Sequence, residues 1–270
     1  MKKKSLMVLL VCSVCLLLLP LKEGEAREEE RAEFVKYFDA AGVSGAMVVY
    51  DQKNDLFSYV NRQRCREGFL PASTFKIPNS LIGLETGVIP DADYLLPWDK
   101  QQRDFPDWNR DHTLRSAFQY SVVWYYQELA RRVGAERMRQ YLERIGYGNG
   151  DIGGRIDHFW LTGALRISPD EQINFLRRLH DNELPFSKRT LDQVKEIMLK
   201  EKTADYVLRA KTGWANEPAD NVGWYVGYLE TGDNVYYFAT VLTAPKPVPA
   251  DFTTQRIRIT NAVLHELGIF

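Results

Sequence analysis

Ser73 and Lys76 lie three residues apart in the segment PASTFK, residues 71–76. On a helix, residues with this spacing share one face, so the hydroxyl and the amine could point into one pocket. A serine hydroxyl is a weak nucleophile until a base takes its proton, and a neutral lysine, or a group built on it, could be that base. The pattern alone is weak evidence for catalysis, because an N-cap serine followed by a solvated lysine gives the same sequence pattern.

Two further short patterns follow along the chain. The segment SVV begins at Ser121, whose hydroxyl could relay a proton, while Val123 could keep a site dry. The segment KTG begins at Lys211, where a cation and a hydroxyl would suit a substrate carboxylate. Gly213 would let the backbone approach a substrate closely. Each pattern is weak alone, but the three in this order are a strong indication of a serine nucleophile assisted by lysines.

The sequence predicts no metal site. The glycine-rich segment GYGNGDIGG at 146–154 resembles a phosphate-binding loop only superficially, because it follows no strand signal and lacks G-K-[ST]. The four histidines also lack the spacing of metal ligands, and they are His112, His158, His180 and His265.

The composition is that of an ordinary globular protein. The chain has 270 residues, of which 45% are hydrophobic and 26% are charged. This length suits one large domain or two interleaved subdomains. The formal net charge of −1 predicts no general attraction to nucleic acid or to an anionic membrane. Both a monomer and a homodimer are compatible with the sequence.

Residues 1–26 are typical of a secretory signal peptide. They begin with the basic MKKK, continue with an apolar run from Leu6 to Leu19, and end at the small residue Ala26. A membrane anchor is the alternative, but a spanning helix needs about 20 apolar residues. We therefore expect a mature chain of residues 27–270, exported to the periplasm or secreted, with membrane contact only during export.

The cysteines fit this prediction. Lipid attachment at Cys12 or Cys15 is a further alternative, which the bulky Val11 and Val14 disfavour. Cleavage would leave only Cys65, so we expect no internal disulfide even in an oxidising compartment. Cys65 should be either buried and inert or a site of adventitious dimerisation.

Strand-like segments lie at both ends of the mature chain. The β-branched and aromatic runs at 45–51 and 56–60 flank the turn signal DQKND and predict a hairpin. Three later runs, at 206–213, 221–230 and 235–242, are also strand-like and are separated by turn signals.

The middle of the chain has helical patterns. We expect one helix to begin near Ser73 or Thr74 and to end before Gly87, and helical structure over 113–145. Further helices are expected at 168–182, with Ser168 as N-cap and Pro169 at the first position, at 191–200 and at 253–269. The prediction is an α+β fold, in which the N- and C-terminal strands pair into one antiparallel sheet. Helices flank that sheet, the last helix covers it, and a mostly helical subdomain is inserted.

The chain resembles the class D serine β-lactamases, the oxacillinases, over nearly all of its mature length. Val123 stands where relatives outside this class have the asparagine of S-x-N, and a tryptophan follows Asn149 by eleven residues. The resemblance implies the fold of the penicillin-recognising serine enzymes. It rests on PASTFK (71–76), SVV (121–123), YGN (147–149), FWL (159–161), KTG (211–213), GWYVGY (223–228) and the arginine of TTQRIRI (253–259).

The resemblance implies that Ser73 attacks the β-lactam carbonyl and forms an acyl-enzyme. Lys76 would carry a carboxyl group taken up from CO2 or bicarbonate, act as general base, and need no other cofactor. Carboxylation requires the neutral amine, and only about 0.04% of an exposed lysine is neutral at pH 7. We therefore expect Lys76 to be buried behind Phe75, Val123 and Leu161.

Other roles follow from the same resemblance. Trp160 would donate its indole N–H to the carboxyl group on Lys76, because a buried anion needs donors. Ser121 would pass a proton to the departing lactam nitrogen, and Lys211 would lower the cost of charge nearby. These two residues complete the predicted catalytic set with Ser73, Lys76 and Trp160.

We expect the substrate to bind along the KTG segment, residues 211–213. Thr212 and Arg256 would hold its carboxylate, with Arg258 as the alternative to Arg256. The backbone N–H groups of Ser73 and Trp214 would form the oxyanion hole. The predicted substrate-binding residues are Val123, Thr212, Gly213, Trp214 and Arg256.

The resemblance predicts hydrolysis of penicillins and related β-lactams, and hence antibiotic resistance. The main alternative is the sensor domain of a β-lactam receptor, which is acylated but does not deacylate. A third function, that of a peptidoglycan D,D-peptidase, is disfavoured by Val123. The range of substrates depends on the shapes of the loops around 98–112 and 214–221.

Overall fold

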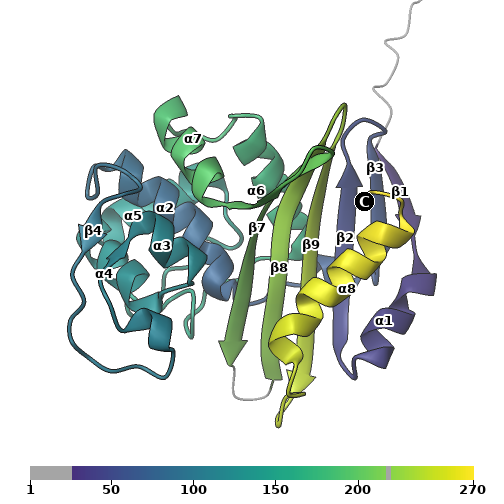
Figure 1. The fold of residues 1–270 in the computed structure, drawn as a ribbon, viewed down its shortest axis with the longest axis horizontal. Coiled ribbons are helices and arrows are strands. Elements are labelled where there is room, and N and C mark those ends of the chain that lie inside the picture. The colour runs from purple at the N-terminus through teal and green to yellow at the C-terminus, as the bar shows by residue number, and fades with distance from the viewer. Residues whose placement is uncertain (1–25, 217–219) are drawn as a thin grey trace, which may run out of the picture.

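The computed structural model describes residues 26–216 and 220–270. It confirms the expected α+β architecture, a seven-stranded sheet with helices on both faces (Figure 1). All of the predicted signal peptide except Ala26 lies outside the described residues. The sheet has the order β1-β3-β2-β9-β8-β7-β6, and its strands are β1 (Arg27–Glu30), β2 (Ser44–Asp51), β3 (Leu56–Val60), β6 (Leu199–Lys202), β7 (Tyr206–Asn216), β8 (Asp220–Thr231) and β9 (Val235–Pro245).

Strands from the two ends of the chain meet at the centre of the sheet. β2 pairs antiparallel with β9, and β2 and β3 form the predicted hairpin. One pairing corrects the expectation of a purely antiparallel sheet, because β1 runs parallel to β3. The four residues of β1 are charged and exposed, so no apolar alternation indicated a strand there.

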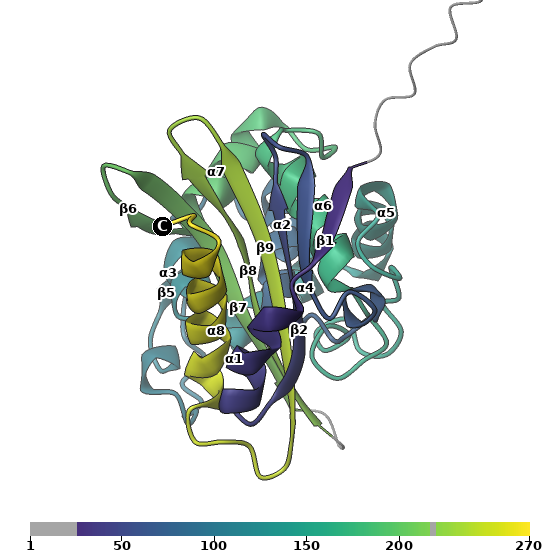
Figure 2. The same cartoon turned by 90° about the vertical axis from the view of Figure 1, so that its right-hand side faces the viewer.

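Helices cover both faces of the sheet (Figures 1 and 2). α1 (Val35–Ala40) and α8 (Phe252–Glu266) pack on one face, where Phe38, Phe252 and Val263 join a buried apolar cluster. The expected covering by the last helix is therefore confirmed. The opposite face carries the helical subdomain, which consists of α2 (Lys76–Glu85), α3 (Leu114–Gln119), α4 (Val123–Val133), α5 (Ala135–Ile145), α6 (Pro169–His180) and α7 (Lys188–Ile197), beside the short strands β4 (Leu95–Leu96) and β5 (His112–Thr113).

Two breaks interrupt the helical pattern predicted over 113–145. α3 and α4 are separated at Ser121, which has a φ of 57°, and α4 and α5 at Gly134, with a φ of 80°. Both values lie in the left-handed region, where a helix cannot continue. The first break places the Ser121 side chain in a turn at the end of a helix.

α6 begins as the sequence predicts. The Ser168 hydroxyl accepts a hydrogen bond from the Glu171 backbone N–H, the Glu171 carboxylate accepts one from Ser168, and Pro169 is the first helical residue. The prediction of a helix over 191–200 is wrong at the C-terminal end, because α7 ends at Ile197 and Leu199–Lys202 forms β6. All four β6 residues are exposed, so this segment is a strand because it pairs with β7 and not because one of its faces is buried.

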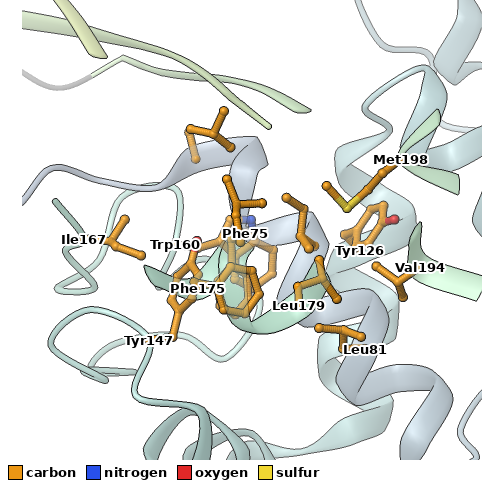
Figure 3. Packing of buried hydrophobic residues seen from close by; sticks show 14 of the residues in the cluster. Phe75, Leu81, Tyr126, Tyr147, Trp160, Ile167, Phe175, Leu179, Val194 and Met198 are labelled. Carbon is orange, nitrogen blue, oxygen red and sulfur yellow. The ribbon is translucent and has the colours of Figure 1, made fainter. Parts of the chain in front are cut away.

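An aromatic core lies between the sheet and the helical subdomain and supports the start of α2 (Figure 3). Phe75 stacks on Trp160 with ring centroids 5.2 Å apart and meets Tyr147 edge-on at 5.8 Å. Cys65 is a free thiol that is fully buried, which favours the inert alternative. Among the described residues, none of the helices has the length and apolarity needed to cross a membrane.

Candidate active site

The Lys76 amine lies 2.8 Å from the Ser73 hydroxyl and donates a hydrogen bond to it. Ser73 belongs to a 3-10 turn, Ala72–Phe75, that leads directly into α2, so the predicted i, i+3 spacing brings the two groups together. Ala72 has a φ of 49°, a strained value for a residue with a Cβ. Its N–H donates to the Trp160 carbonyl at 3.0 Å, which holds the turn in place.

Lys76 is fully buried, and its burial lowers the pKa of the amine to about 7. The amine lies over the face of the Tyr126 ring, 5.1 Å from the ring centre. A pKa near 7 means that about half of the amine is neutral at neutral pH. The expected buried lysine therefore lies beside the serine hydroxyl, and an aromatic ring that the sequence analysis had not selected lies beneath its amine.

Lys211 lies on the other side of the site. Its amine is 3.0 Å from the Ser121 hydroxyl and 3.0 Å from the Thr212 carbonyl oxygen, and it donates to both. Burial lowers the pKa of Lys211 well below its ordinary value, and the neighbouring Lys76 adds to this shift. The two buried lysines therefore hold one serine hydroxyl each, in a region of positive charge.

A pocket of about 420 Å³ opens beside these groups and contains Ser73, Ser121 and Thr212. Its wall includes four aromatic side chains, and three of them, Phe105, Tyr120 and Trp214, are more than a third exposed. A cavity of this size fits a small molecule. The lining residues are Ser73, Phe105, Trp108, Tyr120, Ser121, Val123, Leu161, Thr212, Gly213, Trp214, Asn216, Thr253 and Arg256.

Gly213 allows β7 to pass close to the nucleophile. A Cβ at this position would lie 3.0 Å from the Pro71 carbonyl oxygen and 3.2 Å from Thr74 Cγ2. These contacts are too close for any other residue to fit without a shift of the 71–75 turn. The structure thus gives Gly213 a second reason to be glycine, because β7 lies close to the turn that carries Ser73.

Arg256 reaches the pocket from the first turns of α8. Its guanidinium donates to the Gly213 carbonyl oxygen at 2.8 Å, and the residue is 9% exposed. Burial lowers the pKa of Arg256 to about 10, so it remains a cation at neutral pH. Arg258, the alternative, points away, since its side chain is 69% exposed and pairs with Asp251.

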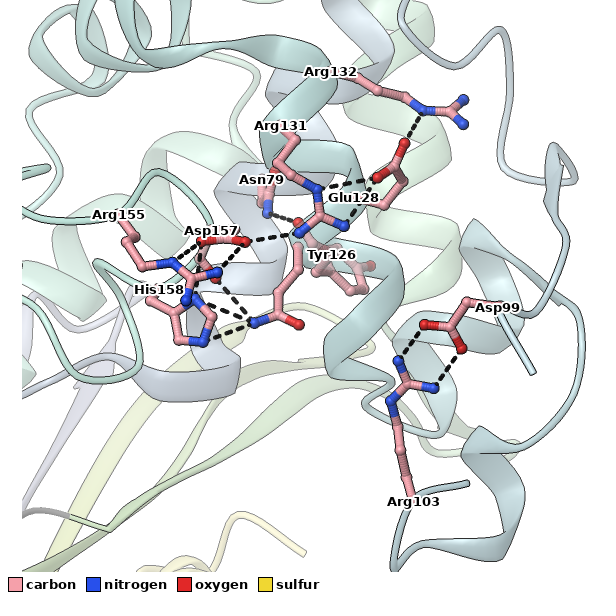
Figure 4. Close-up of polar contacts among 11 residues, drawn as sticks. Asn79, Asp99, Arg103, Tyr126, Glu128, Arg131, Arg132, Arg155, Asp157 and His158 are labelled. Atoms are coloured by element: carbon pink, nitrogen blue, oxygen red, sulfur yellow. Dashed lines mark hydrogen bonds and ion pairs between the residues drawn. The ribbon is translucent and has the colours of Figure 1, made fainter. Parts of the chain in front are cut away.

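Trp160 is buried and stacks on Phe75, next to Lys76 in the chain. The segment that carries it is held to α4 by Asp157, whose carboxylate accepts hydrogen bonds from Arg131, Arg155 and His158 (Figure 4). Burial opposes ionisation of Asp157, but the hydrogen bonds from His158, Arg155 and Arg131 prevail and lower its pKa. This ion-pair network borders a separate polar pocket that does not include Ser73.

Seven of the ten predicted site residues line the pocket, and Lys76 and Lys211 are hydrogen-bonded to two of these seven, Ser73 and Ser121. Trp160 does not line the pocket and stacks on Phe75. Sequence reasoning missed Phe105, Trp108, Tyr120, Asn216 and Thr253, which line the same pocket. Phe105 and Trp108 lie in the segment 98–112, which we expected to affect the range of substrates. The sequence does not show which side chains of this segment face the pocket. Within the described ranges 26–216 and 220–270, no three histidine, cysteine or acidic side chains are grouped to bind a metal.

Comparison with known proteins agrees with this geometry. Residues 45–267 match the family model of the penicillin binding protein transpeptidase domain. Fold and site thus define a serine hydrolase built on the penicillin binding protein transpeptidase domain. Beta-lactamase OXA-48 of Klebsiella pneumoniae is 42% identical over 259 residues, which cover 96% of this chain and 95% of that protein.

A solved structure, the class D beta-lactamase YbXI from Nostoc, has 50% sequence identity and a TM-score of 0.84, over 87% of this chain and 98% of that one. The chain belongs to the class D β-lactamase family, which confirms the family and the enzyme class expected from the motifs. Regulatory protein BlaR1 of Bacillus licheniformis is also similar, at 34% identity over 242 residues that cover 89% of this chain and 40% of that protein.

Proposed function

We propose that this protein hydrolyses the β-lactam ring of penicillins and related antibiotics through an acyl-enzyme on Ser73, and so confers resistance. The observation that carries the proposal is the 2.8 Å contact between the Ser73 hydroxyl and a fully buried Lys76. A lysine that burial has made partly neutral can help to remove the hydroxyl proton. The Ser73 oxygen then forms a bond to the lactam carbonyl carbon, and the C–N bond of the ring breaks.

Lys76 is proposed to be carboxylated by CO2 from bicarbonate. The neutral amine forms a bond to the carbon of CO2 and releases one proton, which explains why a lowered pKa is needed. On Lys76, the carboxyl group would supply the general base for acylation and for attack by water. Trp160 stacks on Phe75, the residue before Lys76, and is proposed to donate its indole N–H to that group.

The ring nitrogen must gain a proton as the C–N bond breaks. Ser121 is the proposed donor, because its hydroxyl lies in the pocket and is bonded to the Lys211 amine. Lys211 can replace the proton that Ser121 gives up. Its low pKa, caused first by burial, makes it a better proton donor than an exposed lysine.

The edge of β7 supplies the proposed oxyanion hole. The Ala210 N–H points away from β8, because it donates to the Met198 carbonyl next to β6. Backbone groups alternate in direction along an antiparallel strand, so the Trp214 N–H points to the same edge. β6 pairs with β7 only as far as Arg209, which leaves this N–H free to join that of Ser73.

The substrate carboxylate is proposed to bind Thr212 and Arg256. Both residues line the pocket, and Arg256, which remains a cation at neutral pH, gives it a positive charge. Val123 and Leu161 form its apolar side beside Ser73. We also propose export of the protein through residues 1–26 to the periplasm or the exterior, as a monomer or homodimer.

The test is a mass spectrum of the protein during incubation with benzylpenicillin, together with turnover kinetics. The wild type should gain the mass of one penicillin transiently and consume the drug continuously. Ser73→Ala should give no adduct and lower kcat by about a thousandfold or more. Ser187→Ala, which removes the N-cap of α7 outside the pocket, is the matched control and should retain turnover. Turnover by Ser73→Ala without loss would refute the proposal.

The similarity to BlaR1 favours a β-lactam sensor as the second candidate. A sensor would be acylated at the same Ser73, but the adduct would remain. A single burst equal to the protein concentration, followed by no further consumption of a chromogenic cephalosporin, would therefore select the sensor. Steady turnover would select the hydrolase.

A further inference from the structure

Trp214 is a large aromatic side chain at the mouth of the active-site pocket. It is 40% exposed, and it lines the same cavity as Ser73 and Thr212. An exposed indole would sample several rotamers unless something held it, and an ordered side chain binds a substrate at lower entropic cost.

The indole N–H donates a hydrogen bond of 3.0 Å to the side-chain carbonyl of Asn221. Asn221 lies on the neighbouring strand β8, is only 2% exposed and does not line the pocket. Trp214 is paired with Gly223 across the strands, and Asn221 is two residues before that glycine, on the same face. Asn221 is thus a diagonal neighbour of Trp214 on the adjacent strand, within reach of a large aromatic side chain.

We propose that Asn221 is a positioning residue, which fixes the orientation of the Trp214 ring and so sets the affinity of the pocket for its substrate. The inference rests on the proposed β-lactam substrate. Asn221 would act only through Trp214, because its own amide is buried outside the cavity. A ring that is held in the same way in the bound ground state and in the transition state stabilises both states equally. Loss of the ring's fixed orientation should therefore raise KM and leave kcat unchanged.

The experiment is a double-mutant cycle with benzylpenicillin. Asn221→Ala removes the acceptor, and Trp214→Phe keeps an aromatic ring but removes the N–H. Each single variant should raise KM by about threefold to tenfold and keep kcat within about twofold. The double variant should be no worse than Trp214→Phe, because both changes break one hydrogen bond.

A matched control separates this effect from general destabilisation. Asn234 is also a buried asparagine, but it lies in the β8–β9 turn and donates a hydrogen bond to Asp51, so Asn234→Ala should leave KM unchanged. Additive effects in the double variant, or an unchanged KM in either single variant, would overturn the inference. If Asn221→Ala fails to fold, Trp214→Phe alone still decides the matter, since an unchanged KM would show that the hydrogen bond is without effect. Absence of any adduct or turnover in the wild type would instead be a failure of the proposed function.

Discussion

The Lys76 amine lies over the face of the Tyr126 ring, 5.1 Å from its centre, and the Tyr126 hydroxyl is 2.9 Å from the Ser80 hydroxyl. The ring is therefore fixed at its far end and forms a rigid floor under the amine. Ser73 provides the hydrogen-bond partner above it. A buried amine with so few polar partners lowers the stability of the folded protein, so position 76 links stability to reactivity.

Replacing Lys76 by methionine should stabilise the fold while removing activity. The lysine pKa falls from about 10.5 in the unfolded chain to about 7 when folded, so between these values the unfolded state binds more protons. Stability of the wild type therefore rises with pH in this window. We expect Lys76→Met to raise the free energy of unfolding by about 2–4 kcal/mol near pH 7, and this gain to shrink toward pH 10.

Urea denaturation in CO2-free buffer, near pH 7 and near pH 9.5, measures this difference. Lys188→Met is the control, because Lys188 is exposed and should show no such dependence on pH. A Lys76→Met variant that is less stable than the wild type at both pH values would contradict the account of the buried amine.

Activity should depend on bicarbonate after acidification. Below a pKa of about 7 the Lys76 amine is protonated, and a protonated amine cannot hold a carboxyl group. Protein acidified, freed of CO2 and returned to neutral pH should be poorly active, and bicarbonate should restore its turnover. Recovery at the same rate and to the same level without bicarbonate would exclude carboxylation of Lys76.

Arg256 and Arg258 offer a matched pair of variants in one helix. Arg256 lines the pocket and is bonded to Gly213, whereas Arg258 is exposed and pairs with Asp251. Arg256→Ala should raise KM for benzylpenicillin by about tenfold or more, since a buried charged hydrogen bond is lost. Arg258→Ala should have no effect on KM, and equal effects of the two variants would argue against the assigned carboxylate site.

Local signals in the sequence predicted those parts of the fold that depend on nearby residues. The Ser73–Lys76 spacing, the Ser168 cap of α6 and the β2–β3 hairpin are all set within one turn or one hairpin. β1 and β6 were missed, because their residues are all exposed and mostly charged. Each segment becomes a strand only by pairing, β1 with the distant β3 and β6 with β7, which follows it in the chain. Local patterns contain no information about such pairing.

The same distinction applies to the site. Motif residues were found because their spacing is fixed, but Tyr126, Thr253 and Asn221 enter or support the pocket only through packing between separate elements. The choice between Arg256 and Arg258 depended on which face of α8 meets β7. The tertiary structure shows that Arg256 lines the pocket and that Arg258 is exposed.

Trp160 should act mainly on release of the acyl group. Trp160→Phe keeps a ring that can stack on Phe75 but removes the indole N–H. We expect the acyl adduct to form at nearly the wild-type rate and to persist at least about tenfold longer, because an unpaired buried anion on Lys76 is less stable. Stopped-flow acylation and mass spectrometry of the adduct measure the two steps. An equal loss in both steps would count against a donor role for this indole.

Asp157 should stabilise the segment that carries Trp160. Its buried carboxylate joins Arg131 of α4 to Arg155 and His158, which lie five and two residues before Trp160 along the same segment. Asp157→Asn leaves these donors without an anion, and we expect a loss of about 1–2 kcal/mol in the free energy of unfolding. The lowered pKa means that this stabilisation is present above about pH 4 and lost as the pH falls further.

Thermal or urea denaturation from pH 7 to pH 3 measures that loss in both proteins. The wild type should lose more stability than Asp157→Asn over this acidic range, because only the wild type has a carboxylate to protonate there. Asp192→Asn, which alters an exposed pair with Lys188, is the control and should change the acid profile little. If Asp157→Asn and the wild type have parallel acid profiles, the network shown in Figure 4 does not hold the Trp160 segment through this charge.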